Sequence, residues 1–271
     1  MLPTRSRWTE PIFEEALERC RLRNSQGIKC TVALLANAPR NLEQANDGLR
    51  VHLAMVRLLA QQRVESSVTL KPTVVGALLD MDFCLESLLT LSNAAQARGV
   101  AVEIATEGKS LVPDIVDAAV ACAGENENVT LDLQAYLDRT PKDVDTAVRH
   151  GVKVRLVKGA YAGDTADFSE IQRRFMSLAE LILKGGQPLL LGTHDPDLVQ
   201  WAKQQAVSDR SRVEFGFLMG LADQTKLDLA GQGWRVREYV PFGENSEAYV
   251  RRRESYLQDL EKMGRAALPV G

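Results

Sequence analysis

The sequence predicts an α/β protein, a single (β/α)8 barrel of the TIM type that spans residues 1–271. Eight short apolar runs alternate with amphipathic stretches at about 30-residue spacing, which is the pattern of a closed parallel barrel. The rival is a doubly wound open sheet. It has less support, because no GxGxxG motif follows any of the apolar runs.

The predicted strands come in chain order, each followed by a helical pattern. An additional helix precedes the first strand, within the first 25 residues. The clearest amphipathic helices cover residues 82–98, 167–183 and 245–263, where apolar side chains recur at helical spacing. The eight strands are expected at residues 29–35, 67–71, 101–105, 129–134, 152–157, 188–193, 212–217 and 235–240.

Helix start and stop signals agree with this order. In Asp195-Pro196 and Thr140-Pro141, a capping residue precedes a proline at the first helical position. Glycines that close helices stand before the expected strands. They are Gly99, Gly151, Gly185 with Gly186, and Gly233.

Composition narrows the class of protein. The net charge is −3 and 45% of residues are hydrophobic, as in ordinary globular proteins, and no basic stripe suggests nucleic acid. No apolar run reaches the roughly 18 residues of a membrane span, and the N-terminus lacks a signal-peptide core. We therefore expect one domain in the cytoplasm.

Cysteine and histidine usage argues against a metal site. The four cysteines share no CxxC spacing, so reduced, buried thiols are expected. The chain has only three histidines, and the polar residues at the strand ends are rich in cations and donors but poor in carboxylates. This balance suits an anionic or electron-accepting ligand. These strand-end residues are Asn37, Lys71, Thr106, Glu107, Gln134, Arg155, Lys158, Tyr161, Thr193, His194 and Tyr239.

The most informative stretch is Arg-Leu-Val-Lys-Gly-Ala-Tyr at residues 155–161. A buried parallel strand is normally an unbroken apolar run, and cations in it are costly without an anionic or electron-rich neighbour. At the carboxyl end of a barrel strand that neighbour is usually a ligand.

This stretch resembles the fifth-strand motif of proline dehydrogenases, flavoenzymes that oxidise proline. Four further segments are similar to motifs of the same family on the second, fourth, sixth and eighth strands, and the last helix resembles the family's helix with paired arginines. The resemblance covers residues 29–260. The segments are residues 68–73, 133–136, 192–195 and 239–243, and the helix begins at Glu247.

The resemblance implies FAD as cofactor. Arg155 would stand near the N5 edge of the flavin, where a cation stabilises arriving negative charge, and Gln134 would bond the pyrimidine side. The alternative for Arg155 is an ion pair with a barrel carboxylate, and for His194 a place in the core. The implied cofactor-binding residues are Gln134, Arg155, Val157, Lys158, Gly159, Ala160, Thr193 and His194.

The resemblance also implies an amino-acid substrate whose carboxylate is bound by Arg252 and Arg253, leaving Arg251 for solvent. Without the resemblance, this arginine run would be a solvated helix face. Lys71 would pair with the same carboxylate, and Tyr161 and Tyr239 would pack on the ring. The implied catalytic residues are Lys71, Arg155, Tyr239, Arg252 and Arg253.

Three positions depart from the family pattern, because Asn37, Ala105 and Tyr256 stand where a carboxylate is usual. The expected reaction is oxidation of L-proline, a CH–NH donor, to Δ1-pyrroline-5-carboxylate with a quinone as electron acceptor and peripheral membrane contact. The departures leave open hydroxyproline, an N-alkyl proline or pipecolate as substrate, or a barrel that binds without turnover. A Schiff base on Lys71 or Lys158 is a further alternative.

Overall fold

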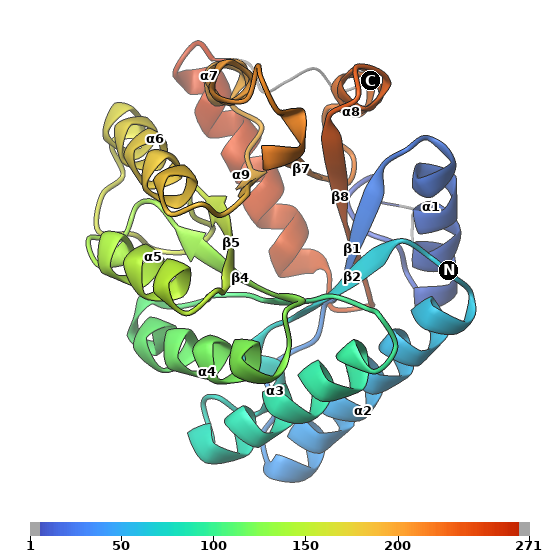
Figure 1. The fold of residues 1–271 in the computed structure, drawn as a ribbon. Coiled ribbons are helices and arrows are strands. Elements are labelled where there is room, and N and C mark those ends of the chain that lie inside the picture. The colour runs from blue at the N-terminus through green and yellow to red at the C-terminus, as the bar shows by residue number, and fades with distance from the viewer. Residues whose placement is uncertain (1–5, 266–271) are drawn as a thin grey trace. The chain divides into compact units, whose positions relative to one another are not determined.

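The structure is a computed structural model that describes residues 6–265, apart from the side chain of Glu125. Its eight strands form a closed barrel in chain order (Figure 1). The predicted (β/α)8 fold is therefore confirmed, and the open sheet is excluded. The strands are β1 (Lys29–Leu34), β2 (Ser66–Leu70), β3 (Val102–Ile104), β4 (Val129–Gln134), β5 (Lys153–Val157), β6 (Leu189–Gly192), β7 (Val213–Leu218) and β8 (Arg235–Phe242).

The helices alternate with the strands, after one additional N-terminal helix. Short 3-10 turns, η1 (Pro72–Val75), η2 (Lys109–Leu111) and η3 (Arg210–Arg212), accompany them. The helices are α1 (Phe13–Ser25), α2 (Leu42–Gln61), α3 (Met81–Gln96), α4 (Val112–Glu125), α5 (Thr140–Arg149), α6 (Phe168–Lys184), α7 (Pro196–Gln205), α8 (Asp223–Gly231) and α9 (Glu247–Lys262).

Of the two predicted helix-capping residues, Asp195 is confirmed and Thr140 is wrong. The carboxylate of Asp195 accepts a hydrogen bond from the amide of Asp197 and caps α7. Thr140 is instead the first residue of α5, and Arg139 precedes it without a side-chain cap. The Thr140 hydroxyl donates to the carbonyl of Gln134 at 2.5 Å, because a buried hydroxyl takes the nearest acceptor.

The chain divides into two compact units, which we describe separately. The first unit comprises residues 6–36, Val64–Ser66 and 192–265 of the described chain. In it β8 pairs in parallel with both β1 and β7. The buried carboxylate of Glu238 on β8 accepts a bond from Arg19 Nε at 2.7 Å and is paired with Arg23 and Lys226. Burial alone would raise the pKa of Glu238, but these cations hold it below its usual value. The ion pairs therefore anchor α1 and α8 to the outside of β8.

The second unit comprises Asn37–Arg63 and Ser67–Leu191. In it β2, β3, β4 and β5 pair successively in parallel. Helices α2 and α3 pack side by side, as Figure 1 shows. Asp80 and Asp167 cap α3 and α6, each accepting a bond from an amide three residues on. These side-chain caps fix where α3 and α6 begin.

All four cysteines are buried and free, as the sequence predicts. Within residues 6–265 no helix is long and apolar enough to cross a membrane. In the same range, no three His, Cys, Asp or Glu side chains are grouped as a metal ion would need.

Candidate active site

The predicted site residues lie at or near the carboxyl ends of strands and on α9, in both units. In the second unit, Gln134 and Val157 end β4 and β5, and Lys71 directly follows β2. Lys158, Gly159, Ala160 and Tyr161 follow β5. In the first unit, Thr193 and His194 follow β6, Tyr239 lies within β8, and Arg252 and Arg253 lie on α9.

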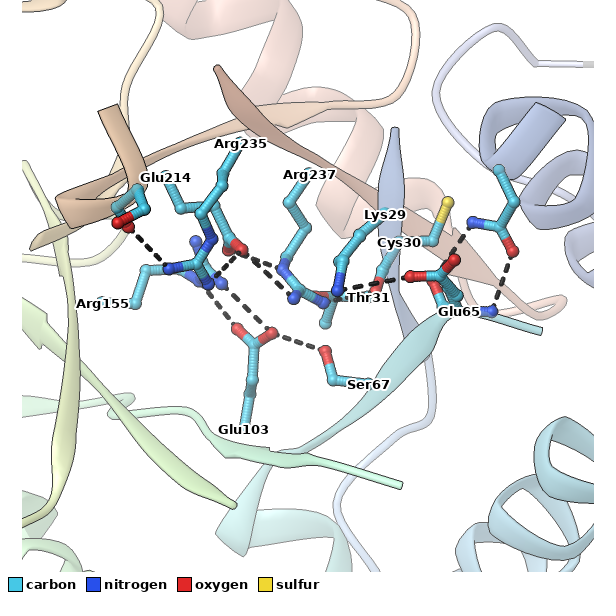
Figure 2. Close-up of polar contacts among 12 residues, drawn as sticks. Lys29, Cys30, Thr31, Glu65, Ser67, Glu103, Arg155, Glu214, Arg235 and Arg237 are labelled. Carbon is cyan, nitrogen blue, oxygen red and sulfur yellow. Dashed lines mark hydrogen bonds and ion pairs between the residues drawn. The ribbon is translucent and has the colours of Figure 1, made fainter. Parts of the chain in front are cut away.

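Arg155 lies inside β5, two residues before the strand ends, and forms a buried ion pair. Its Nε donates to Glu103 Oε2 at 2.7 Å and its Nη2 to Oε1 at 3.3 Å. The hydroxyl of Ser67 donates to the same carboxylate at 2.6 Å, as Figure 2 shows. The ion pair considered as the alternative for Arg155 is therefore present. It still leaves Arg155 as a cation fixed within the barrel wall.

Asp132 on β4 is register partner to Arg155 and adds a second carboxyl group to this cluster. Burial and the charge of Glu103 raise its pKa to about 8, against the lowering effect of Arg155. Its Oδ1 is buried and has no hydrogen-bond partner among the described residues. At neutral pH, Asp132 is therefore protonated, and the carboxylate of Glu103 is a charged partner of Arg155.

The amide of Gln134 is hydrogen-bonded on both sides by protein groups. Its Nε2 donates to Thr106 Oγ1 at 3.1 Å and to the carbonyl of Glu107 at 3.0 Å. Its Oε1 accepts the hydroxyl of Tyr136 at 2.7 Å. A ligand contact from this amide would therefore replace one of these bonds.

Lys158 is held beside α6. Its ammonium lies 3.7 Å from the centre of the Phe168 ring, a cation–π contact that favours the charged form. A lysine that forms a Schiff base needs the opposite, a depressed pKa. The contact therefore argues against Lys158 as a Schiff-base nucleophile.

In the second unit, Glu107 accepts hydrogen bonds from the turn after Lys71, and the charge of Lys71 affects the pKa of His52. The two carboxylate oxygens of Glu107 accept the amide and hydroxyl of Thr73, both at 3.0 Å. Glu107 thus braces the turn that follows Lys71. Burial, together with the charge of Lys71, lowers the pKa of His52 to about 4.

In the first unit, Tyr239 and Tyr249 stack, with ring centres 6.3 Å apart and planes at 26°. The guanidinium of Arg253 lies over the Tyr249 ring at 5.2 Å. The Tyr249 hydroxyl and Arg253 Nε are buried atoms without a hydrogen-bond partner among the described residues. Buried donors of this kind are costly unless a ligand satisfies them.

Tyr249 is a further candidate site residue, which the sequence patterns did not indicate. The signal available was its spacing, since positions three and four before Arg252 and Arg253 share their helix face. Arg252 and Arg253 are half-buried, whereas Arg251 is exposed, as expected. Burial raises the pKa of Tyr249 to about 12, so its hydroxyl remains a donor at physiological pH.

His194 is neutral and has a defined tautomer. The backbone N–H of Leu218 donates to its Nε2 at 3.0 Å, so the ring proton is assigned to Nδ1. Burial, together with the charges of Lys226 and Arg253, lowers the pKa of His194 to about 3. His194 therefore offers an N–H donor at all physiological pH values. The neighbouring Thr193 hydroxyl accepts the amide of Asp195 at 3.2 Å.

The three positions that depart from the family pattern have ordinary local roles. Ala105 donates its amide to the carbonyl of Leu70 across β2 and β3. Tyr256 is half-buried, and burial with the charge of Asp195 raises its pKa to about 12. Asn37 is exposed and lies three residues after the end of β1.

A parallel barrel with donors and cations at its strand ends defines a class of small-molecule enzymes, and comparison with known proteins identifies the family. A sequence profile described as "Proline dehydrogenase" matches residues 16–257. The chain belongs to the proline dehydrogenase family and is therefore an oxidoreductase.

Individual relatives agree with this assignment. Proline dehydrogenase 2 of Bacillus subtilis (strain 168) is 29% identical over 248 residues, which cover 89% of this chain and 82% of the relative. Proline dehydrogenase of Deinococcus radiodurans is 30% identical over 134 residues, 47% of this chain and 43% of that protein.

Solved structures share the fold. Proline utilization A (PutA) from Bdellovibrio bacteriovorus, inactivated by N-propargylglycine, matches 91% of this chain with a TM-score of 0.82 and 20% identity. A Bradyrhizobium japonicum PutA mutant, D778Y, matches 93% with a TM-score of 0.74 and 19% identity. This chain spans about a third of those longer chains, 32% and 30% respectively.

Proposed function

We propose that this chain, as one domain, binds FAD and oxidises L-proline to Δ1-pyrroline-5-carboxylate, with a quinone as the electron acceptor. The observation that carries the proposal is the family match over residues 16–257, which includes every proposed site residue. When bound, FAD would supply the acceptor for the electrons removed from proline.

The residues present suit that cofactor. Arg155 is a buried, fixed cation, and a fixed cation beside an electron acceptor stabilises the negative charge that reduction brings. His194 presents its Nδ1–H, and Gln134 ends β4 beside the Lys158–Ala160 turn. Donors and cations of this kind match the electron-accepting ring and the phosphates of FAD, with Thr193 and Val157 as further contacts.

The substrate would be held by its carboxylate and its ring. Arg252 and Arg253 supply a pair of guanidinium groups for the carboxylate, and Lys71 supplies a third cation. The stacked Tyr239 and Tyr249 offer an aromatic surface to a small ring, and Tyr161 would pack on it as well. Charge therefore orients the substrate, and the aromatic rings select its size.

A related cyclic amino acid is the second candidate substrate. Asn37, Ala105 and Tyr256 leave the proposed pocket with fewer carboxylates than the family pattern provides. Fewer carboxylates would favour a ligand with more negative charge or a different ring. Hydroxyproline, an N-alkyl proline and pipecolate are the compounds to compare, and a barrel that binds without turnover is the remaining possibility.

The test is an assay of the protein reconstituted with FAD, with a soluble quinone as acceptor and o-aminobenzaldehyde to trap the product. Trapped Δ1-pyrroline-5-carboxylate from L-proline, faster than product from the other three compounds, is the expected result. Product from another cyclic amino acid alone would replace the substrate. No product from any of them would favour a binding role. With a quinone acceptor, the protein would act in the cytoplasm with peripheral membrane contact, which liposome co-sedimentation would test.

A further inference from the structure

Tyr136, two residues beyond β4, fills a space that two glycines leave open. Its side chain is 6% exposed. A Cβ built on Gly159 would lie 1.5 Å from the Tyr136 ring, and one on Gly163 would lie 2.4 Å from it. The turn between β5 and α6 therefore closes directly over the tyrosine ring, at a distance that a side chain at either position would prevent.

The hydroxyl of Tyr136 connects this turn to Gln134. The backbone N–H of Tyr161 donates to the hydroxyl oxygen at 2.7 Å. The hydroxyl donates its single proton to Gln134 Oε1, also at 2.7 Å. Tyr161 is the proposed substrate contact and Gln134 the proposed flavin contact. One hydroxyl thus lies between the two.

The direction of the hydrogen-bond chain is fixed beyond Gln134. The Thr106 hydroxyl donates its one proton to the carbonyl of Asp132 at 2.8 Å, so towards Gln134 it can only accept. Gln134 Nε2 supplies that proton, which leaves Oε1 to face Tyr136. Each side chain in this series of hydrogen bonds therefore has one orientation in which all of these bonds are formed.

The backbone of Tyr136 holds the same turn at both of its ends. Its N–H donates to the carbonyl of Lys158 at 3.2 Å, and its carbonyl accepts the amide of Asp164 at 3.2 Å. Residues 159–163 are therefore enclosed between two backbone bonds, with the hydroxyl bond to Tyr161 in the middle. This loop, residues 159–163, can move as a unit only if its hydrogen bonds to Tyr136 break.

We propose that Tyr136 is a positioning residue that couples the ligand contact of Gln134 to the placement of Tyr161. The inference rests on the proposed function for the identity of the ligands. When the Gln134 amide rotates to bind a ligand, it loses one of its hydrogen bonds to the protein. The Tyr136 hydroxyl, which is bonded to Gln134, then shifts, and its hydrogen bond to the backbone N–H of Tyr161 changes with it. Reciprocally, a well-held Tyr161 keeps Gln134 in one orientation.

The test is Tyr136→Phe, which removes the hydroxyl and keeps the ring over the glycines. Hydrogen exchange of the purified protein is measured at the amide of Tyr161, and FAD affinity and the KM and kcat for proline are measured beside it. We expect exchange at Tyr161 to be about tenfold faster, since one hydrogen bond is lost. FAD binding should weaken and KM should rise more than kcat falls.

The matched control is Lys109→Met, which breaks the exposed ion pair between Lys109 and Asp164 at the end of the same loop. Exposed pairs contribute little, so exchange at Tyr161, FAD affinity and KM should stay at wild-type values. Equal effects of the two variants would mean general loosening of the loop and would overturn the proposal.

Other outcomes are equally decisive. Wild-type exchange at Tyr161 in Tyr136→Phe would overturn the positioning role, and faster exchange with unchanged FAD affinity and KM would overturn the coupling. If the wild-type protein bound no FAD, the proposed function would fail, whereas the exchange result would still decide whether Tyr136 holds the loop. Should Tyr136→Phe not fold, Thr106→Val releases Gln134 from the other side and should also speed exchange at Tyr161.

Discussion

Arg155 and Glu103 form a two-point ion pair inside the barrel wall, with 2.7 Å between Nε and Oε2. Both side chains are nearly buried, at 9% and 4% exposure. Desolvation makes such a pair a weak source of stability as a whole, yet removal of one partner leaves an uncompensated buried charge.

Glu103→Gln should therefore destabilise the protein by about 3 kcal/mol, because the buried Arg155 loses a charged partner. Urea unfolding followed by circular dichroism measures the change. Asp145→Asn is the matched control, since it breaks an exposed pair with Arg149 and should leave the unfolding midpoint unchanged. An unchanged unfolding midpoint for Glu103→Gln would show that this ion pair contributes little to stability.

Asp132 gives the protein a pH dependence whose sign follows from its raised pKa. The unfolded carboxyl loses its proton near its ordinary pKa of 3.8, whereas the folded one keeps it up to about 8. Between these values the folded state binds the extra proton, so this group lowers stability as pH rises. Asp132→Asn should remove that decline. Unfolding free energies at pH 5 and pH 8 should fall less between the two pH values in the variant than in wild type. An equal fall would place the titration elsewhere.

Arg252 and Arg253 on α9 are the proposed carboxylate ligands, and the neighbouring Arg251 serves as the control. Arg252→Met and Arg253→Met should each raise the KM for the substrate by about tenfold or more, since a charged hydrogen bond to the carboxylate is lost. Bound flavin should be unaffected. Arg251→Met, at an exposed position, should behave as wild type. Unchanged kinetics in both inner variants would remove these arginines from the carboxylate site.

Alanine substitutions at Gly159 and Gly151 test whether the close approach of Tyr136 requires a glycine. Both have positive φ, +142° and +74°, but only at Gly159 would a Cβ meet another atom, the Tyr136 ring. Gly151→Ala should cost about 1 kcal/mol of backbone strain. Gly159→Ala should cost clearly more and displace the loop of residues 159–163. Thermal unfolding of the two variants compares them directly, and equal melting temperatures would mean that Tyr136 moves aside without cost.

Sequence patterns were sufficient to predict the barrel, because its strands are covered by helices and read as separate apolar runs. The strand at Val129–Gln134 was predicted to the residue, and the boundaries of the other strands differ from the predicted ones by at most two residues. Cap residues such as Thr140 were less predictable, since a hydroxyl can serve a tertiary acceptor instead of its own helix.

Partners across the barrel were beyond prediction. Nothing in the spacing of Glu103 and Arg155 indicates that they meet, because register and strand tilt decide it. The contacts of Tyr136 and Tyr249 could not be predicted for a similar reason. Tyr136 accepts a hydrogen bond from Tyr161, 25 residues further along the chain, and Tyr249 stacks on Tyr239 of β8.

The proposed function requires that this barrel binds FAD and that proline reduces it. An anaerobic absorbance spectrum of the FAD-reconstituted protein, before and after addition of L-proline, tests it most directly. We expect a visible flavin band that bleaches on addition of proline. A protein that takes up no flavin, or a flavin band that persists with proline and with the other cyclic amino acids, would contradict it.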